Sequence, residues 1–412
     1  MALNHACLPI PAPAQDSPSA RQAISAGTTP RRSSPELRYY SERPGGVNGS
    51  SRPAPTRQSP PEIAIAIAGE TSPLNRRFVS EPMRIVLDAM GSDSAPGPEL
   101  AAAALAHARW GERLTLTGPR QRLEDRPEAA QFELVDAPEV LGMTDKPAEA
   151  ARQKPRSSMA VGMDLLKRGK ADAFVTAGNT GGAMATALFK LGRIPGVKRP
   201  ALGAVFPVRG GSTVVVDIGA NVECKPEYLL QFAIMGSIYA ELVLNRPNPR
   251  VGLLSTGEEE GKGNDLVRQS VPLLRAADLN FIGNLEPKEL YAGRADVVVT
   301  DGFSGNVFLK TSEAVAALLV EWLQTELRAS PISAAGGLLA RPAFRRVSRR
   351  LDPSEYGAVP LLGVDGLVFI GHGRSTDRAL INAVRVAREA VSAGLLQALR
   401  GRLAVALSEV VG

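Results

Sequence analysis

The chain has little of what several functional classes need. Its 412 residues include two cysteines, Cys7 and Cys224, which excludes a disulfide framework and a zinc site built from several thiolates. Of three histidines only His107 and His372 lie beyond residue 82, too few for a three-histidine metal site. We therefore expect neither a bound metal nor a redox cofactor. With 5% aromatic residues and no zinc-finger or RNA-binding signature, we expect no nucleic-acid partner.

Long hydrophobic runs are also missing. No stretch approaches the ~18 apolar residues of a membrane-spanning helix, and the N-terminus lacks the layout of a secretory signal. With 44% hydrophobic residues and a mean hydropathy of -0.04, the composition predicts a globular, cytoplasmic protein. The net charge of +6 and a pI near 9.4 favour an acidic partner, such as an acidic protein or an anionic lipid.

Residues 1–82 differ in composition from the rest. They hold 13 of the 32 prolines, many serines and arginines, and no lysine. Such a segment buries too little apolar surface to offset chain entropy, so we expect a disordered leader and a folded domain at 83–412. Acidic residues such as Asp16 and Glu36 argue against a transit peptide, and a start at Met83 is the alternative interpretation.

Beyond Met83, strand-like runs alternate with helical periodicity. Strands are expected over residues 84–87, 114–117, 132–135, 173–176, 213–216, 251–255, 297–300 and 367–370. Helices are expected over residues 98–109, 159–168, 181–191, 226–244, 312–327 and 375–410. Several strands are too apolar to have a wet face, which is typical of parallel sheets. The order predicts a three-layer α/β/α domain with a mostly parallel sheet.

Four glycine-rich polar segments that follow apolar runs are the main clue to function. They span residues 88–93, 177–182, 217–221 and 301–306. Loops at the carboxyl ends of parallel strands meet at one edge of the sheet, so we expect the four to form one site. Their backbone N–H groups, amides and carboxylates indicate an anion as the ligand.

The segment 177–182 is the best candidate for holding that anion. Its glycines let the backbone close around a tetrahedral group, and the N-terminus of the following helix favours negative charge. The segment is neither a Walker A loop nor a GxGxxG fingerprint, so phosphate or a small phosphorylated group is expected rather than a nucleotide. An ordinary turn in which Asn179 or Thr180 caps the helix is the alternative.

Four further residues carry candidate chemistry. Asp217 and Asn221 follow a β-branched run and would bring a carboxylate and an amide to the site, although Asp217 could also cap a turn. Lys310 and His372 are the candidate cationic or titrating groups, with a snorkelling lysine and a structural histidine as the alternatives. No nucleophile elbow or Ser-His-Asp order is present, so we expect no covalent intermediate.

Eight collinear segments closely resemble those of the bacterial phosphate acyltransferases, also called acyl-[acyl carrier protein] phosphotransacylases. The segments are residues 84–93, 154–159, 177–184, 214–236, 256–265, 301–311, 356–366 and 371–375. The resemblance covers residue 83 to the C-terminus and excludes the leader. Ser92 and Gly182 depart from the family pattern, which usually has glycine and alanine there.

The resemblance implies a homodimeric α/β/α enzyme, related in fold to phosphotransacetylases and isopropylmalate-type dehydrogenases. It would transfer a fatty acyl group from acyl carrier protein to inorganic phosphate without a cofactor. The acyl phosphate would supply a downstream membrane glycerol-3-phosphate acyltransferase in phospholipid synthesis. The alternatives are a phosphotransacetylase that uses acyl-CoA, a metal-dependent hydroxyacid dehydrogenase, and a non-catalytic lipid- or anion-binding scaffold.

For this reaction the expected catalytic residues are Lys310, His372 and Asn221. The expected substrate-binding residues are Asp88, Gly91, Gly178, Asn179, Thr180, Gly181, Asp217, Asp301, Gly302 and Asn306. The backbone of 178–182 would hold phosphate, Asn221 or Asn306 would donate to the oxyanion, and His372 or Lys310 would protonate the departing sulfur.

Basic and apolar segments predict further contacts. Two basic clusters could steer acidic carrier protein, or suit anionic lipid: Arg193, Lys198 and Arg199, and Arg341, Arg345, Arg346, Arg349 and Arg350. An apolar stripe over 315–323 is expected to be a core or dimer face. The Gly-Gly-Leu-Leu sequence within 332–340 is expected to be a loop that makes peripheral contact with the membrane.

Overall fold

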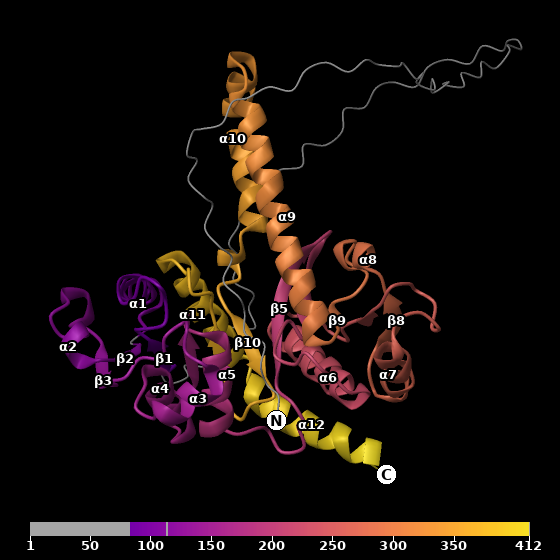
Figure 1. Ribbon diagram of the computed structural model, residues 1–412, viewed down its shortest axis with the longest axis horizontal. Coiled ribbons are helices and arrows are strands. Elements are labelled where there is room, and N and C mark those ends of the chain that lie inside the picture. Colours follow the sequence, from indigo (N-terminus) through magenta and orange to yellow (C-terminus); the bar gives the residue numbers. More distant parts are fainter. Residues whose placement is uncertain (1–82, 113, 412) are drawn as a thin grey trace, which may run out of the picture. The chain divides into compact units, whose positions relative to one another are not determined.

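The computed structural model of the protein describes residues 83–112 and 114–411, so the predicted leader at 1–82 lies outside the described residues. Within them, eleven strands form one sheet in the order β3-β2-β1-β4-β11-β10-β5-β6-β9-β7-β8 (Figure 1). The strands are β1 (Ile85–Asp88), β2 (Thr115–Gly118), β3 (Glu133–Asp136), β4 (Ala173–Thr176), β5 (Ala201–Val208), β6 (Gly211–Val216), β7 (Val251–Leu254), β8 (Phe281–Leu285), β9 (Val297–Val299), β10 (Val359–Leu362) and β11 (Val368–Ile370).

Helices connect most of these strands. They are α1 (Gly97–Trp110), α2 (Arg120–Leu123), α3 (Pro147–Gln153), α4 (Ser158–Lys167), α5 (Thr180–Lys190), α6 (Pro226–Leu242), α7 (Asp265–Ala276), α8 (Pro287–Tyr291), α9 (Gly302–Arg328), α10 (Pro331–Leu351), α11 (Asp377–Ser392) and α12 (Leu395–Val411). Two short 3-10 turns, η2 (Pro127–Ala129) and η3 (Pro353–Glu355), complete the described part.

The sheet is covered on both faces because alternate strand residues point to opposite sides. In β1, Ile85 and Leu87 belong to one buried cluster, whereas Val86 belongs to the other. Helices α1, α6, α7, α11 and α12 contribute to the first cluster, and α3, α4, α5 and α8 contribute to the second. The predicted three-layer α/β/α fold with a mostly parallel sheet is confirmed.

All eight predicted strands are present, but the strict alternation of strand and helix is wrong. The prediction missed β5, β8 and β10, and β5 runs directly into β6 as an antiparallel pair. Gly203 and Pro207 interrupt the apolar pattern of β5, while β8 contains Gly283 in the left-handed region at φ 97°. These residues obscured the strands because both types are depleted in strand interiors.

Three further predictions, one of a helix and two of loops, are also wrong. The stretch at 375–410 forms two helices, because Gly394 adopts φ 65° between α11 and α12. The segment 301–306 is not a loop: Asp301 caps α9, which begins at Gly302 rather than at 312. The expected loop at 332–340 lies within α10, whose first turn is set by Ser330 as the cap and by Pro331.

Helices α9 and α10 form a hairpin (Figure 1) whose surface is almost wholly exposed. The buried residues of α9 are Gly302 and Gly305, and α10 has none. In the predicted apolar stripe, Leu319 is 56% exposed and Trp322 59% exposed. The interpretation of the stripe as core is therefore wrong, and the dimer face stays a prediction. Within the described residues, no helix combines the length and apolarity needed to cross a bilayer.

The two halves of the sheet run in opposite directions. Strand β10 is antiparallel to both β11 and β5, and β5 is antiparallel to β6. The half that contains β1, β4 and β11 therefore points opposite to the half that contains β6, β7 and β9. These central antiparallel pairings, which the sequence pattern did not reveal, contradict the expectation that all four segments leave one edge of a parallel sheet.

The pairing register nevertheless brings the two sets of strand ends to one level. Val359 of β10 pairs with Ile370, the last residue of β11. When β10 is followed into its pairing with β5, Val359 comes level with Ala204, whose partner in β6 is Val215. Strands β11 and β6 therefore end at about the same level along the strand direction, although they run in opposite directions and β10 and β5 lie between them.

Candidate functional site

The loops after β1 and β4 are held together by a buried carboxylate. Thr176 Oγ1 donates to Asp88 Oδ2 over 2.7 Å and accepts from Gly178 N over 3.0 Å. Burial raises the pKa of Asp88, whose side chain is 1% exposed, and the hydroxyl donors act in the opposite direction. A Cβ on Gly91 would lie 2.7 Å from Ala177 N, so only glycine allows this approach.

Asn179 caps α5 and anchors a neighbouring loop. Its Oδ1 accepts from Gly182 N over 2.9 Å. Its Nδ2 donates to the carbonyl oxygens of Gly142, Met143 and Asp145, the shortest being the 2.9 Å bond to Met143. The capping alternative is confirmed for Asn179. Its side chain fixes the start of α5 and the position of the 142–145 loop.

The N-terminus of α5 leaves two backbone donors unused. Gly182 N bonds to the cap and Ala183 N bonds to Asn179 O, whereas the N–H groups of Thr180 and Gly181 have no acceptor among the described residues. The first N–H groups of a helix carry its partial positive charge. Thr180 and Gly181 therefore present two unused backbone donors at the start of α5, in the loop that follows Thr176.

The loop after β6 is organised by Asp217. Its Oδ1 accepts from the backbone N–H groups of Leu202, Gly219 and Ala220 at 3.0 to 3.1 Å. Its Oδ2 accepts from Asn221 N and from Asn221 Nδ2 at 2.7 and 2.9 Å. Burial raises the pKa of Asp217, and the hydrogen bonds from Ala220, the Asn221 side chain, Leu202 and Gly219 oppose that rise. Both carboxylate oxygens therefore accept hydrogen bonds from the protein itself.

Asn221 is held on both sides of its amide nitrogen. Besides the bond to Asp217, its Nδ2 donates to Pro200 O over 2.7 Å. Both hydrogens of this amide are therefore used within the protein.

The first turns of α9 press against this loop. Gly302 N donates to Asn221 O over 2.8 Å. A Cβ on Gly302 would lie 2.6 Å from that oxygen, and a Cβ on Gly305 would collide with the backbone oxygen of Asp217. Asp301 accepts from Ser304 N and Ser304 Oγ, each over 2.8 Å. Two helical glycines thus allow the helix to rest directly on the backbone of the loop.

Helix α9 links this loop to the loop after β11. A Cβ on Gly219 would lie 3.7 Å from the Cβ of exposed Asn306. Lys310 is four residues, or about one turn, further along the same helix face. The charge of Lys310 acts on the imidazole of His372, and Lys310 Nζ pairs with Glu313 Oε2 over 2.9 Å. Helix α9 therefore contacts the 217–221 loop and carries a charge that acts on His372, so it connects two regions that no common edge of a parallel sheet joins.

Charges of both signs affect the pKa of His372. Burial lowers the pKa of His372, and Lys310 and Arg374 lower it further, whereas Glu313 and Asp93 raise it. The ring Nδ1 accepts from Arg374 N over 3.2 Å. In the neutral ring the proton therefore resides on Nε2, which leaves that nitrogen as a donor.

We expect two charge-removing substitutions to shift the titration of His372 in opposite directions. Lys310→Met should raise the pKa of His372, because a cation that disfavours imidazolium is lost. Glu313→Gln should lower it, because a favourable anion is lost. The imidazole proton resonances followed by NMR against pH measure both shifts. Titration curves that superimpose on the wild-type curve in both variants would show that these charges do not reach His372.

The predicted residues fall into two groups. Asp88, Gly91, Gly178, Asn179 and Asp217 support the loops from within, as do Asp301 and Gly302. Asn306, Lys310 and His372 are exposed, as is Thr180. Sequence reasoning missed Thr176 and Arg374, although both stand within or directly beside the predicted glycine-rich segments. The signal that could have found them was their position, Thr176 directly before Ala177 and Arg374 two residues after His372.

The chain resembles known proteins over most of its length. A family model described as "Fatty acid synthesis protein" matches residues 83–398. The phosphate acyltransferase of Acidobacterium capsulatum is 50% identical over 326 residues, which cover 78% of this chain and 97% of that protein. The phosphate acyltransferase of Elusimicrobium minutum is 44% identical over 330 residues, covering 78% and 96%. Among solved structures, the EutD phosphotransacetylase from Staphylococcus aureus aligns at a TM-score of 0.49 and 16% identity, over 76% of this chain and 94% of that one.

Proposed function

Because this chain belongs to the phosphate acyltransferase family, we propose that it transfers a fatty acyl group from acyl carrier protein to inorganic phosphate. The products are an acyl phosphate and the free carrier thiol. The proposal rests on the family relationship, and two features support it: the two unused N–H donors at the start of α5, and the exposed Lys310, whose charge acts on His372. These groups would receive a small anion and stabilise charge without a metal or redox cofactor.

The N-terminus of α5 is the proposed phosphate site. Thr180 N and Gly181 N would each donate to a phosphate oxygen, and the helix dipole favours the bound negative charge. Asn179 contributes through its cap and its bonds to the 142–145 loop, which fix the direction of these donors. In this proposal Thr180 and Gly181 bind phosphate, and the role of Asp88, Gly91, Gly178 and Asn179 is to hold the site in shape.

In the reaction, a phosphate oxygen forms a bond to the thioester carbon while the carbon–sulfur bond breaks. The exposed amide of Asn306 is the proposed donor to the carbonyl oxygen, since both amide hydrogens of Asn221 are already bonded. The ammonium of Lys310 stabilises the departing thiolate, and His372 Nε2–H donates to phosphate or sulfur. The departing thiolate takes its proton from the Lys310 ammonium, and solvent then returns a proton to Lys310.

The reaction is tested with the full chain, palmitoyl-acyl carrier protein and labelled orthophosphate, with hydroxylamine as the trap. We expect palmitoyl hydroxamate to form only when phosphate is present. Lys310→Ala and His372→Ala should each reduce the rate at least about tenfold, which corresponds to ~1.4 kcal/mol. Faster turnover of palmitoyl-CoA at equal concentration would favour the phosphotransacetylase alternative. Phosphate binding without any hydroxamate would favour a non-catalytic scaffold.

The assembly and membrane contacts stay proposals. The exposed apolar residues of α9, such as Leu319 and Trp322, support a homodimer that pairs these helices. Leu338 and Leu339 of α10, 67% and 85% exposed, support peripheral contact with an anionic membrane. There the acyl phosphate would pass to a membrane glycerol-3-phosphate acyltransferase.

A further inference from the structure

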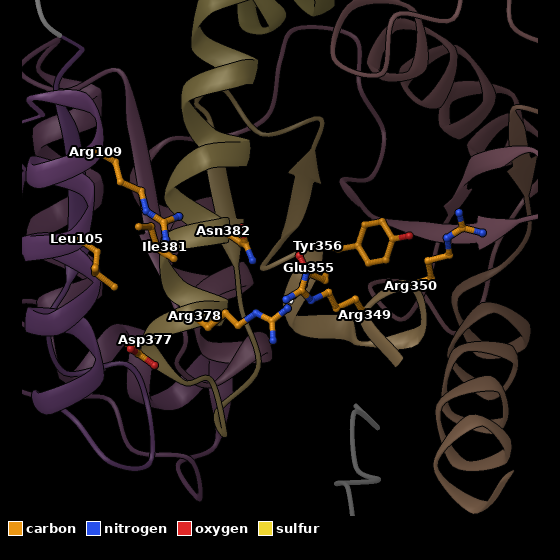
Figure 2. A pocket seen from close by; sticks show the side chains of 10 residues that line it. All are labelled: Leu105, Arg109, Arg349, Arg350, Glu355, Tyr356, Asp377, Arg378, Ile381 and Asn382. Carbon is orange, nitrogen blue, oxygen red and sulfur yellow. Dashed lines mark hydrogen bonds and ion pairs between the residues drawn. The ribbon is translucent and has the colours of Figure 1, made fainter. Parts of the chain in front are cut away.

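A pocket of about 670 Å³ lies outside the proposed reaction site, where α1, α11 and the end of α10 meet (Figure 2). Its lining residues are Leu105, Arg109, Arg349, Arg350, Glu355, Tyr356, Asp377, Arg378, Ile381 and Asn382. Leu105 and Ile381 are the aliphatic residues of this lining, and its arginines come from three helices.

Three of these arginines have no carboxylate partner. Arg378 is neutralised by Asp352, 3.7 Å away, and by Glu355. Arg109, Arg349 and Arg350 are exposed and form no ion pair with any residue in the described part of the chain. Asp377, at the start of α11, is the opposing charge in the lining. The pocket therefore carries an excess of positive charge.

The excess continues along α10. This helix contains five arginines and no acidic residue between Pro331 and Leu351. The arginines at 341, 345 and 349 repeat every four residues, as do those at 346 and 350, so they form a stripe that runs into the pocket. We call the stripe together with Arg109 the arginine patch. A surface of this kind attracts acidic partners from a distance.

The arginine patch lies close to the proposed reaction site. Gly357 directly follows the pocket residue Tyr356, and its carbonyl oxygen would lie 3.4 Å from a Cβ on Gly371. Gly371 in turn precedes His372. A protein bound at the patch would thus have its surface next to the loop that carries His372.

The geometry favours an acidic protein over a lipid surface or a single phosphate. In Figure 2, Arg109 and Arg350 lie on opposite sides of the pocket, so one phosphate group would not bridge them. The charges also surround a recess rather than a flat face, which suits a protruding helix better than a bilayer. Several spaced carboxylates on one protein surface match this arrangement.

We propose that the arginine patch is the docking surface for the acidic face of acyl carrier protein, a proposal that rests on the proposed function. Arg349 and Arg350 contact the carrier from α10, and Arg109 contacts it from α1. The bound carrier then directs its thioester arm past Gly357 and Gly371 toward His372 and Lys310.

The test measures binding of apo-acyl carrier protein, which has neither arm nor acyl group, to the full chain. We expect the double variant Arg349→Glu/Arg350→Glu to weaken binding at least tenfold, and Arg109→Glu to weaken it in the same direction. Wild-type affinity should fall as salt is raised. The matched control is Arg168→Glu at the end of α4, another exposed arginine without an ion pair among the described residues, which should bind as wild type does.

The possible results separate the docking role of the arginine patch from the proposed function. Unchanged carrier affinity in the double variant, or an equal loss in Arg168→Glu, would overturn the proposal. Lost binding to phosphatidylglycerol vesicles with unchanged carrier affinity would assign the patch to lipid and also overturn it. Carrier binding that depends on the patch, without formation of acyl phosphate, would support the patch and reject the proposed function. If the double variant forms acyl phosphate with an unchanged KM for palmitoyl-acyl carrier protein, the proposed function is supported and the docking role of the arginine patch is rejected.

Discussion

Replacing Gly305 with alanine is expected to lower the free energy of unfolding by about 3 kcal/mol. The added Cβ would overlap the backbone oxygen of Asp217, which cannot rotate away as a side chain would. Helix α9 would have to lift from the 217–221 loop, and Asn306 and Lys310 would move with it. We expect acyl phosphate formation to fall about a hundredfold at temperatures where the variant is folded.

Denaturant unfolding and the hydroxylamine assay measure the two effects. Gly401→Ala is the matched control, because Gly401 also lies within a helix and a Cβ there meets no atom within 4 Å. Alanine is the better helix former, so this control should be stabilised by up to about 1 kcal/mol. If both variants are stabilised alike, α9 does not rest on the loop as described.

Asp217→Asn is expected to cost about 3 kcal/mol of stability and to reduce activity by a similar factor of about a hundred. Both oxygens of Asp217 face donors only, three on one side and two on the other. An amide NH2 group would therefore meet N–H groups in either orientation, which leaves buried donors unsatisfied. The loop that positions Asn221 and supports α9 would lose its shape.

The same substitution at Asp301 provides the control. Asp301 caps α9 through Ser304, and asparagine caps helices about as well as aspartate. Asp301→Asn should therefore change stability by less than about 0.5 kcal/mol. Thermal unfolding of the two variants in parallel gives the comparison. Equal losses of stability at both positions would mean that the number of donors around Asp217 does not determine how much Asp217 contributes to the free energy of unfolding.

The contrast between these two aspartates illustrates what sequence patterns could predict. Both follow apolar runs and begin a glycine-rich segment, so both were assigned to the site. The capping role of Asp301 follows from local sequence. The five donors around Asp217 come partly from Leu202, which is distant in the sequence, and no local pattern reports such a neighbour.

The helical hairpin gives a second example. An apolar period of 3.6 residues over 315–323 correctly predicted a helix, but not whether that face is covered. Exposure depends on which elements of the chain fold over the stripe, and in the structure its residues stay 41 to 59% exposed. The start of α9 at Gly302 was missed because two glycines disfavour a helix locally, while contact with the 217–221 loop favours it.

Apolar periodicity, turn chemistry and collinear motifs are properties of short stretches, so they were enough to predict the layered α/β architecture, the glycine-rich segments and the family. The opposed halves of the sheet, the contact of α9 with the 217–221 loop and the pocket lined by arginines of three helices became visible in the folded chain alone. Those features depend on pairing register and on packing between residues far apart in the chain, and the free energy of such contacts is set by the whole fold.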